Sequence, residues 1–284
     1  MRLVTYDSGR GPRAGVLSGE HGIVDIWDSL GEEPRCEPSL SEVIRAGLLE
    51  KARGVEGAEP TAHVHESALL PPILDPGKII CLGLNYGSHA EETGREAPDQ
   101  PTIFGKYANA LAPPGATVKL PAYSEKVDYE AEVAFVVGER SKDVSEADAI
   151  AKLAGYMLLN DLSARDFQFK TPQWMPGKIF DGAAPCGPAL VTPDEAGPPD
   201  RIEIQLTLNG EVMQHATTAD LIHSIPALVV HLSMLMTLEP GDIVSTGTPA
   251  GVGSVRTPRV WLKPGDEMVV SSPQLGTLET TLAR

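Results

Sequence analysis

Residues 126–138, KVDYEAEVAFVVG, predict a β-strand, because apolar residues alternate with acidic ones through its first half. Successive side chains of a strand point to opposite faces, so Asp128, Glu130 and Glu132 share one face, which continues as apolar residues. If this face is exposed, water screens the carboxylates. If it is buried, the like charges need a cation or a proton between them, and a divalent metal with oxygen ligands would provide one. The strand alone leaves both interpretations open.

Another apolar run also ends in a carboxylate. Residues 155–159 predict a second strand, and Asn160 and Asp161 follow it directly. A side chain at a strand end is held by the sheet and can still face a pocket, although an aspartate there more often caps the following turn. Together with Glu130 and Glu132, Asp161 would form an all-oxygen site that suits Mg²⁺ or Mn²⁺ better than Zn²⁺.

A histidine and a glutamate three residues apart offer acid–base chemistry. Residues 86–93 predict one or two turns of helix, on which His89 and Glu92 share a face. The carboxylate could then fix the imidazole tautomer and leave the other ring nitrogen to act as a base. The alternative is a solvated histidine beside acids, which is the more common case for such a pair taken alone.

Two further segments could bind an anion. Lys178 lies in the sequence PGKIFD, where it could be partly buried and directed at a negative charge. The sequence GTP at residues 247–249 could offer backbone N–H groups and a hydroxyl to a carboxylate. Each signal is weak alone, because most lysines are only solvated. His63 and His65 would share a strand face, but no cysteine lies nearby and the HExxH motif is absent.

Composition argues against several classes of protein. The 284 residues include 23 Lys and Arg against 39 Asp and Glu, a net charge of −16, which argues against nucleic-acid and anionic-membrane partners. No apolar run approaches ~18 residues, and the first residues lack the apolar core of a signal peptide. The 3 cysteines are scattered, so we expect a reduced, cytoplasmic protein without disulfides. The sequence fingerprints of dinucleotide-binding, phosphate-loop, serine-hydrolase and zinc-protease proteins are absent.

Turn residues divide the chain into a small N-terminal α+β domain, residues 1–70, and a larger β-rich domain, residues 71–284. In the first we expect three short strands, a helix over residues 39–46 and a polar linker over residues 54–62. In the second, residues 94–125 are rich in loops. The other elements predicted there are strands at 78–84, 202–208, 242–246 and 267–271, a hairpin turn at Asn209-Gly210, and helices at 145–154 and 225–238.

Five motifs follow one another along the second part. They are Gly83-Leu-Asn-Tyr86…His89-x-x-Glu92, Asp128-Tyr-Glu130-Ala-Glu132, Asn160-Asp161-x-Ser-Ala-Arg165-Asp-x-Gln168, Gly177-Lys-x-Phe-Asp181 and Glu239-Pro-Gly-Asp242…Thr246-Gly-Thr-Pro249-x-Gly-Val-Gly253. In this order they resemble the fumarylacetoacetate hydrolase family, in particular its bacterial acylpyruvase and 2-hydroxyhepta-2,4-diene-1,7-dioate isomerase members. The resemblance covers about residues 78–284, and the ordered set is far more specific than any single motif.

The resemblance implies a mixed, β-rich fold in which a β-sandwich roll forms the catalytic domain, and it implies a homodimer. It places the ligands of one Mg²⁺ or Mn²⁺ ion at Glu130, Glu132 and Asp161, and it makes Asp128 no ligand. By the same match, His89 and Glu92 activate water, Lys178 steadies developing negative charge, and Gln168, Gly247 and Thr248 contact the substrate with support from Arg165.

The implied substrate is a small 2-oxo acid with a further carbonyl or carboxylate group. Breaking its C–C bond leaves a pyruvate enolate, whose charge the metal and Lys178 would stabilise. We expect hydrolysis of an acylpyruvate. The alternative is a decarboxylase or isomerase of oxaloacetate-type or 2-hydroxyhepta-2,4-diene-1,7-dioate-type substrates in aromatic catabolism. A non-catalytic β-protein with a structural cation is a third hypothesis, and it does not explain why His89, Glu92 and Lys178 accompany the ligands.

Overall fold

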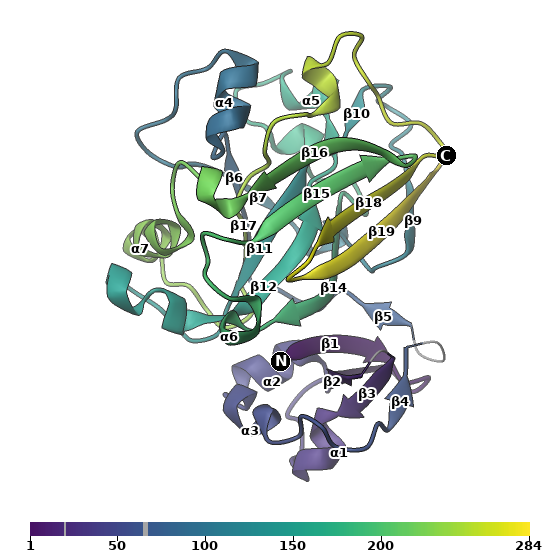
Figure 1. Cartoon of the computed structure of the whole chain (residues 1–284), viewed down its shortest axis with the longest axis vertical. Helices are drawn as coiled ribbons and strands as arrows, with labels where there is room; N and C mark the ends of the chain where they lie inside the picture. The colour runs from purple at the N-terminus through teal and green to yellow at the C-terminus, as the bar shows by residue number, and fades with distance from the viewer. Residues whose placement is uncertain (20, 65–67) are drawn as a thin grey trace.

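The computed structural model describes residues 1–19, 21–64 and 68–284, and β-sheets dominate them (Figure 1). The largest sheet is mixed and has 12 strands. Its continuous path runs β4 (Ala62–His63), β3 (Gly22–Asp25), β2 (Pro12–Ser18), β1 (Arg2–Asp7), β14 (Ala184–Val191), β12 (Leu153–Asn160), β11 (Ala131–Val137), β17 (Ile243–Ser245), β6 (Ile79–Gly83) and β7 (Thr102–Lys106). Outside this path, β5 (Leu69–Leu70) pairs with β1, and β8 (Leu111–Ala112) pairs with β14.

A second sheet packs on the first and forms a β-sandwich with it (Figure 1). Its order is β16 (Glu211–Thr217), β15 (Glu203–Leu208), β18 (Glu267–Ser272), β19 (Gly276–Ala283) and β9 (Ala116–Lys119). Every second residue of β15 is buried, because one face of this sheet contacts β11 and the other faces solvent. A short third sheet pairs β10 (Val127–Asp128) with β13 (Ser163–Ala164). The predicted mixed, β-rich sandwich is confirmed.

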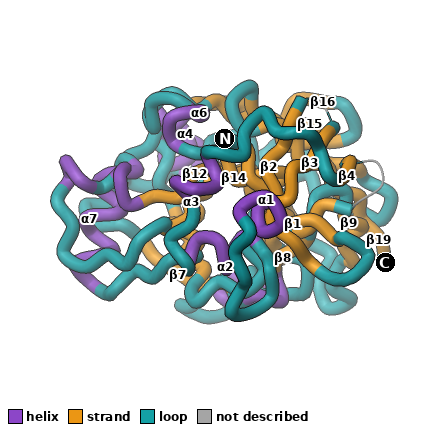
Figure 2. Tube along the Cα trace, turned by 90° about the horizontal axis from the view of Figure 1, so that it is seen from below, coloured by secondary structure: helices purple, strands orange, loops and turns teal. Residues whose placement is uncertain are grey.

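The helices are short and connect the strands. They are α1 (Ile26–Leu30), α2 (Leu40–Arg45), α3 (Leu49–Arg53), α4 (Gly87–Thr93), α5 (Arg165–Gln168), α6 (Pro193–Ala196) and α7 (Ile225–Leu235), with single 3₁₀ turns η1 (Ala108–Ala110), η2 (Glu146–Asp148), η3 (Ile150–Lys152), η4 (Met175–Gly177), η5 (Thr218–Asp220) and η6 (Gly253–Val255). Figure 2 shows α7 at one edge of the molecule, far from β9 and β19. This helix confirms the one expected at 225–238, and the Ser224 side chain accepts a hydrogen bond from Ala227 at its start.

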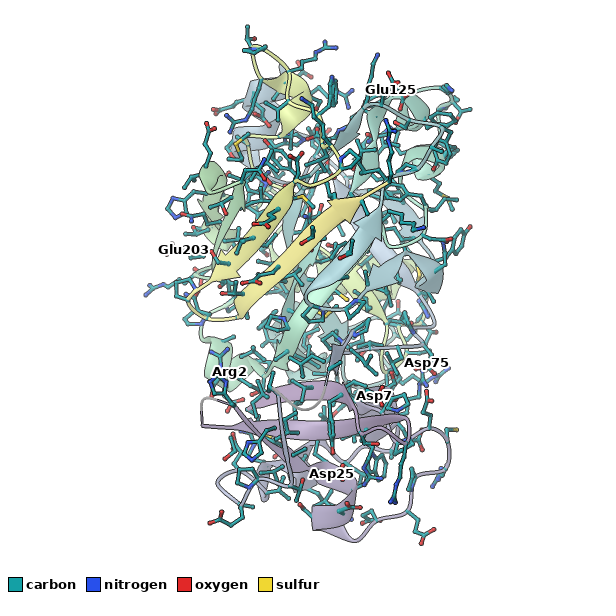
Figure 3. All side chains as sticks on the ribbon, turned by 90° about the vertical axis from the view of Figure 1, so that its right-hand side faces the viewer. Arg2, Asp7, Asp25, Asp75, Glu125 and Glu203 are labelled. Carbon is teal, nitrogen blue, oxygen red and sulfur yellow. The ribbon has the colours of Figure 1, made fainter. Side chains whose placement is uncertain are left out.

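The N-terminal residues form β1 to β4 with α1 to α3 and lie at one end of the molecule (Figure 1). Asp25, labelled in Figure 3, ends β3, the third of the expected N-terminal strands, because its carboxylate accepts a hydrogen bond from the Asp28 amide at 2.9 Å and caps α1. Strand β1 pairs with β14, so one sheet continues from this segment into the rest of the chain. The domain boundary near residue 70 stays a prediction. His65 lies outside the described residues, and His63 is exposed on β4.

Two predictions of secondary structure are wrong. The strand expected at 126–138 is two strands, β10 and β11, which pair with different partners. The helix expected at 145–154 is replaced by η2 and η3, because Leu153 already pairs with Val137 and starts β12. Tertiary strand pairing here overrides a helical sequence pattern.

The other strand predictions agree with the structure. The strands expected at 78–84, 202–208, 242–246 and 267–271 are β6, β15, β17 and β18. The two-residue hairpin is confirmed as well. Asn209 and Gly210 have φ angles of 52° and 83°, which is the left-handed conformation that a type I′ turn requires at both positions.

Candidate active site

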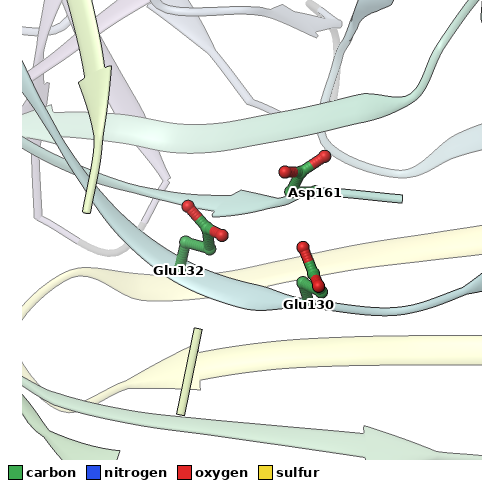
Figure 4. A group of neighbouring side chains, drawn as sticks. All are labelled: Glu130, Glu132 and Asp161. Carbon is green, nitrogen blue, oxygen red and sulfur yellow. The ribbon is translucent and has the colours of Figure 1, made fainter. Parts of the chain in front are cut away.

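Three carboxylates, those of Glu130, Glu132 and Asp161, point toward one another (Figure 4). Oxygen atoms of Glu130, Glu132 and Asp161 lie within 4.8 Å of one another, and all three side chains are buried. Glu132 is on β11, Glu130 lies in the break between β10 and β11, and Asp161 follows β12. The antiparallel pairing of β11 with β12 brings them together, and the Asp161 amide donates to the Glu130 carbonyl at 2.8 Å. Their role as metal ligands stays a prediction.

Side-chain hydrogen bonds explain the break before β11. The Glu130 amide donates to the Asn160 side chain at 3.1 Å, and the Ala131 amide donates to Gln214 at 2.9 Å. Asp128 leaves the acidic cluster, because its carboxylate accepts the amide of Gly253 at 2.8 Å and the Arg165 guanidinium at 2.9 Å. The break therefore points two acids into the cluster and turns the third away from it.

Buried cations surround the cluster. The Lys178 ammonium lies 2.5 Å from Glu130 and 2.8 Å from Asp161. Arg165 donates to the other oxygen of Glu130 at 2.7 Å. Lys106, the last residue of β7, donates to the second oxygen of Asp161 at 2.6 Å and to the Lys178 carbonyl. With Asp128 counted and all four carboxylates ionised, the three cations leave one negative charge, which a divalent ion would convert to one positive charge.

Lys106 is the functional residue that the sequence analysis missed. Residues 94–125 contain many turn-forming residues, and this composition concealed β7. The available signal was the segment TIFGK, in which Phe104 and Lys106 alternate with exposed or half-buried neighbours. A lysine on the buried face of a strand needs an acidic partner, and such a position predicts one.

The electrostatics of the cluster favour a bound cation. Burial, and then the charges of Asp161 and Glu130, raise the pKa of Glu132 to about 8. Burial alone would also raise the pKa of Glu130, but Arg165 and Lys178 outweigh it and lower that pKa. Glu132 thus carries a proton at neutral pH that a metal ion would replace. The three buried carboxylates fit a hard divalent cation such as Mg²⁺ or Mn²⁺.

His89 and Glu92 form the expected pair on α4. The His89 Nδ1 atom lies 2.6 Å from the Glu92 carboxylate, whose other oxygen accepts the Gly251 amide at 2.9 Å. Glu92 therefore holds the proton on Nδ1 and leaves Nε2 as the basic nitrogen. Both residues line the same cavity as Glu130 and Glu132, so a base and the acidic cluster face one space.

That cavity has a volume of about 630 Å³. The predicted site residues that line it are His89, Glu92, Glu130, Glu132, Arg165, Gln168, Lys178 and Thr248. Asp161 lies beneath Lys178 and has no exposed surface. Gly247 donates its amide to Glu132 at 3.1 Å, and the Thr248 hydroxyl donates to the Ala131 carbonyl at 2.9 Å. The expected substrate donors at Gly247 and Thr248 are therefore already bonded within the protein, and substrate contact there stays a prediction.

One loop organises both halves of the site. Within residues 247–253, the amide of Gly247 binds Glu132, that of Gly251 binds Glu92 and that of Gly253 binds Asp128. Gly251 has a φ of 106°, and a Cβ atom there would lie 2.1 Å from the Met213 carbonyl oxygen. Only glycine fits this position without moving the backbone.

The mixed β-sandwich thus places a buried acidic cluster and a histidine–glutamate pair around one cavity. Residues 78–283 match the family described as fumarylacetoacetate (FAA) hydrolase C-terminal, and the chain belongs to that family. Among the described residues, none of the helices combines the length and the hydropathy of a membrane span.

Known relatives span nearly the whole chain. Mitochondrial oxaloacetate tautomerase FAHD2A of Bos taurus is 38% identical over 285 residues, 98% of this chain and 90% of its own. A 2-hydroxyhepta-2,4-diene-1,7-dioate isomerase from Mycobacterium marinum has a TM-score of 0.78 at 32% identity, covering 100% and 98% of the two chains. Maleylpyruvate hydrolase from Sphingobium sp. SYK-6, solved with manganese(II) and pyruvate, has a TM-score of 0.79 at 30% identity, covering 100% and 99%.

Proposed function

We propose that this chain is a Mg²⁺- or Mn²⁺-dependent enzyme that forms the enolate of a 2-oxo acid, and that its reaction is the keto–enol tautomerisation of a 2-oxo diacid such as oxaloacetate. The observation that carries the proposal is the single cavity lined by Glu130 and Glu132 of the acidic cluster, by Lys178 and by the His89–Glu92 pair. The similarity to an oxaloacetate tautomerase over almost the full chain favours this reaction among those of the family.

Glu130, Glu132 and Asp161 would hold the ion. When bound, the ion would take the 2-oxo and carboxylate oxygens of the substrate as ligands and draw negative charge toward them. Lys178 is buried beside the same carboxylates, and Asp161 and Glu130 raise its pKa although burial opposes them, so it stays protonated next to the developing oxyanion.

The histidine supplies the proton transfer. His89 Nε2 removes a proton from C3 of the substrate, and Glu92 steadies the imidazolium that forms. A proton returned to the 2-oxygen gives the enol, and a proton returned to C3 restores the keto form. No atom is gained or lost, so the site needs no co-substrate for this reaction.

Acylpyruvate hydrolysis is the second candidate, and the His89–Glu92 geometry favours it. The same Nε2 atom could deprotonate a water that attacks the distal carbonyl, after which the C–C bond breaks and the pyruvate enolate takes up a proton. A relative solved with pyruvate, a maleylpyruvate hydrolase, supports this candidate. Decarboxylation would need no activated water, so it would survive loss of His89.

Both candidates can be tested with one protein preparation. Enol oxaloacetate absorbs in the ultraviolet, so tautomerisation is followed directly, and acylpyruvate hydrolysis is followed by pyruvate release. We expect metal-dependent tautomerisation that the Glu130→Ala, Glu132→Ala double variant lacks. Pyruvate release from an acylpyruvate without tautomerisation would replace the first candidate by the second. Metal binding without turnover of either substrate would refute both and favour a structural cation.

A further inference from the structure

The helix that carries His89 and Glu92 has no capping group of its own. Helix α4 has only 7 residues, and the residue before it, Tyr86, offers no side-chain hydrogen bond to its first amides. A helix this short is unstable alone, because few hydrogen bonds offset the entropy lost in forming its first turn. Contacts with other segments must therefore fix the position of the helix, and with it the position of the His89 imidazole.

An aspartate from a distant segment caps this helix. The carboxylate of Asp220, the last residue of η5, accepts hydrogen bonds from the Ser88 amide at 3.1 Å and from the Ser88 hydroxyl at 2.5 Å. Its other oxygen lies against the first residue of the helix, where a Cβ atom on Gly87 would come within 3.0 Å of it. Aspartate is among the best helix-capping residues. Asp220 therefore takes, from 132 positions beyond Ser88, the role that the residue before a helix usually has.

Hydrogen bonds around a buried asparagine hold the segment of Asp220 beside the start of α4. The Ile222 amide donates to the Asn85 carbonyl at 2.8 Å. The Asn85 side chain accepts the His223 amide at 2.8 Å and donates to the Thr246 carbonyl at 2.9 Å. Because Thr246 directly follows β17, these bonds tie both segments to the large sheet. Asp220 is therefore held in a fixed position relative to the sheet and to the helix.

Ser88 also connects the helix to the loop that contains Gly251. The Ser88 hydroxyl oxygen accepts the Ala250 amide at 3.4 Å, while its proton is donated to Asp220. The other end of α4 contacts the same loop through Glu92, whose carboxylate accepts the Gly251 amide. The helix is therefore held at both ends. Asp220 fixes its first turn without lining the cavity in which the substrate would bind.

We infer that Asp220 is a positioning residue of this enzyme, which sets where His89 Nε2 lies relative to the substrate carbon without touching the substrate. The inference rests on the proposed function, because it takes His89 as the base. Ser88 transmits the effect, since both of its hydrogen bonds to Asp220 fix the first turn of the helix. A misplacement of about 1 Å can slow a reaction by about 10²-fold, so a small shift of this turn would be enough to lower the rate.

The test measures tautomerisation of oxaloacetate by Asp220→Ala. We expect kcat to fall about tenfold, with KM and the calorimetric Mg²⁺ affinity unchanged, because the acidic cluster keeps its contacts. Asp220→Asn should recover most of the loss, since asparagine caps a helix about as well as aspartate does. In a His89→Ala background, Asp220→Ala should cause no further loss, because no base is left to position. The matched control is Asp148→Ala, which removes an exposed carboxylate that accepts the Ser145 hydroxyl at 2.6 Å and does not line the cavity.

Amide hydrogen exchange of the Mg²⁺-loaded protein tests the anchoring without turnover. Peptides that cover α4 should exchange faster in Asp220→Ala than in the parent, while peptides of β11 and β12 and the whole control variant should exchange like the parent. Unchanged exchange of α4, or a loss of kcat that persists in the His89→Ala background, would overturn the inference. Absence of tautomerisation by the parent would refute the proposed function instead, and the exchange of α4 would then still decide whether Asp220 holds the helix.

Discussion

Replacing Glu132 by glutamine should stabilise the metal-free protein at alkaline pH. Glutamine has the shape of a protonated glutamic acid and can still accept the hydrogen bond of Ser245. Burial and the charges of Asp161 and Glu130 raise the pKa of Glu132 from 4.5 to about 8, so the folded protein binds this proton more tightly than the unfolded chain does. The stability that the proton provides is complete below about pH 4.5 and is lost as the pH rises through 8.

The pKa of Glu132 sets how much unfolding free energy is lost when its carboxyl group is deprotonated. At about 1.4 kcal/mol for each pKa unit, the rise corresponds to roughly 5 kcal/mol, an upper value because Lys178 and Ser245 can rearrange around the anion. A loss of this size is comparable to the whole free energy of unfolding of many domains, ~5–15 kcal/mol. The glutamine variant lacks this loss. The difference in unfolding free energy between the variant and the parent should therefore grow steadily between pH 5 and 8.

Urea unfolding at a series of pH values, in the presence of a chelator, measures the effect. We expect the two proteins to have similar unfolding free energies near pH 5 and to diverge toward pH 8, with the variant more stable. Saturating Mg²⁺ should reverse the order, because the ion binds the deprotonated carboxylate of the parent and displaces its proton. Parallel stability curves with and without the substitution would show that Glu132 is not held protonated and would refute the reasoning.

Three further predictions concern the same cavity. His89→Ala should lower kcat for tautomerisation by about 10²- to 10⁴-fold while calorimetry shows unchanged Mg²⁺ affinity, and parental turnover would remove His89 from the mechanism. Mg²⁺ titration of the Glu130→Ala, Glu132→Ala double variant should show no binding, and a binding isotherm like that of the parent would place the metal elsewhere. Oxalate, a planar dianion that resembles the enolate, should compete with substrate only when metal is present, and Lys178→Met should weaken it by about 2–5 kcal/mol, far more than the surface change Lys152→Met. Equal competition in metal-free protein would contradict the proposed arrangement.

Local patterns in the sequence were sufficient where neighbouring residues decide the structure. The Asn209-Gly210 turn follows from backbone conformations that few other residues adopt, and His89 and Glu92 meet because helical spacing alone sets their distance. The convergence of Glu130, Glu132 and Asp161 could be expected from the strand ends together with the family resemblance.

Contacts between distant segments could not be predicted from these local patterns. Gln214 and Asn160 interrupt the strand before β11 through side-chain hydrogen bonds, and neither bond has a signature in residues 126–138. Lys106 pairs with an aspartate 55 residues further along the chain, so only the folded sheet shows that partner. The helix expected at 145–154 fails for the same reason, because pairing of β11 with β12 outweighs a weak local preference.

The loop at residues 247–253 has a consequence for how this enzyme can diverge. Its backbone amides hold an acid of the cluster through Gly247 and the acid that orients the histidine through Gly251. Any substitution that shifts this loop would disturb ion binding and proton transfer together. Few variants of the loop would therefore change ion binding without also changing proton transfer. The side chains of Lys126 and Arg259, which line the same cavity, make no hydrogen bond or ion pair with the described residues, so each can change without moving this loop. Activity on new substrates should therefore arise from substitutions elsewhere in the cavity lining, while the residues of the glycine-rich loop stay unchanged.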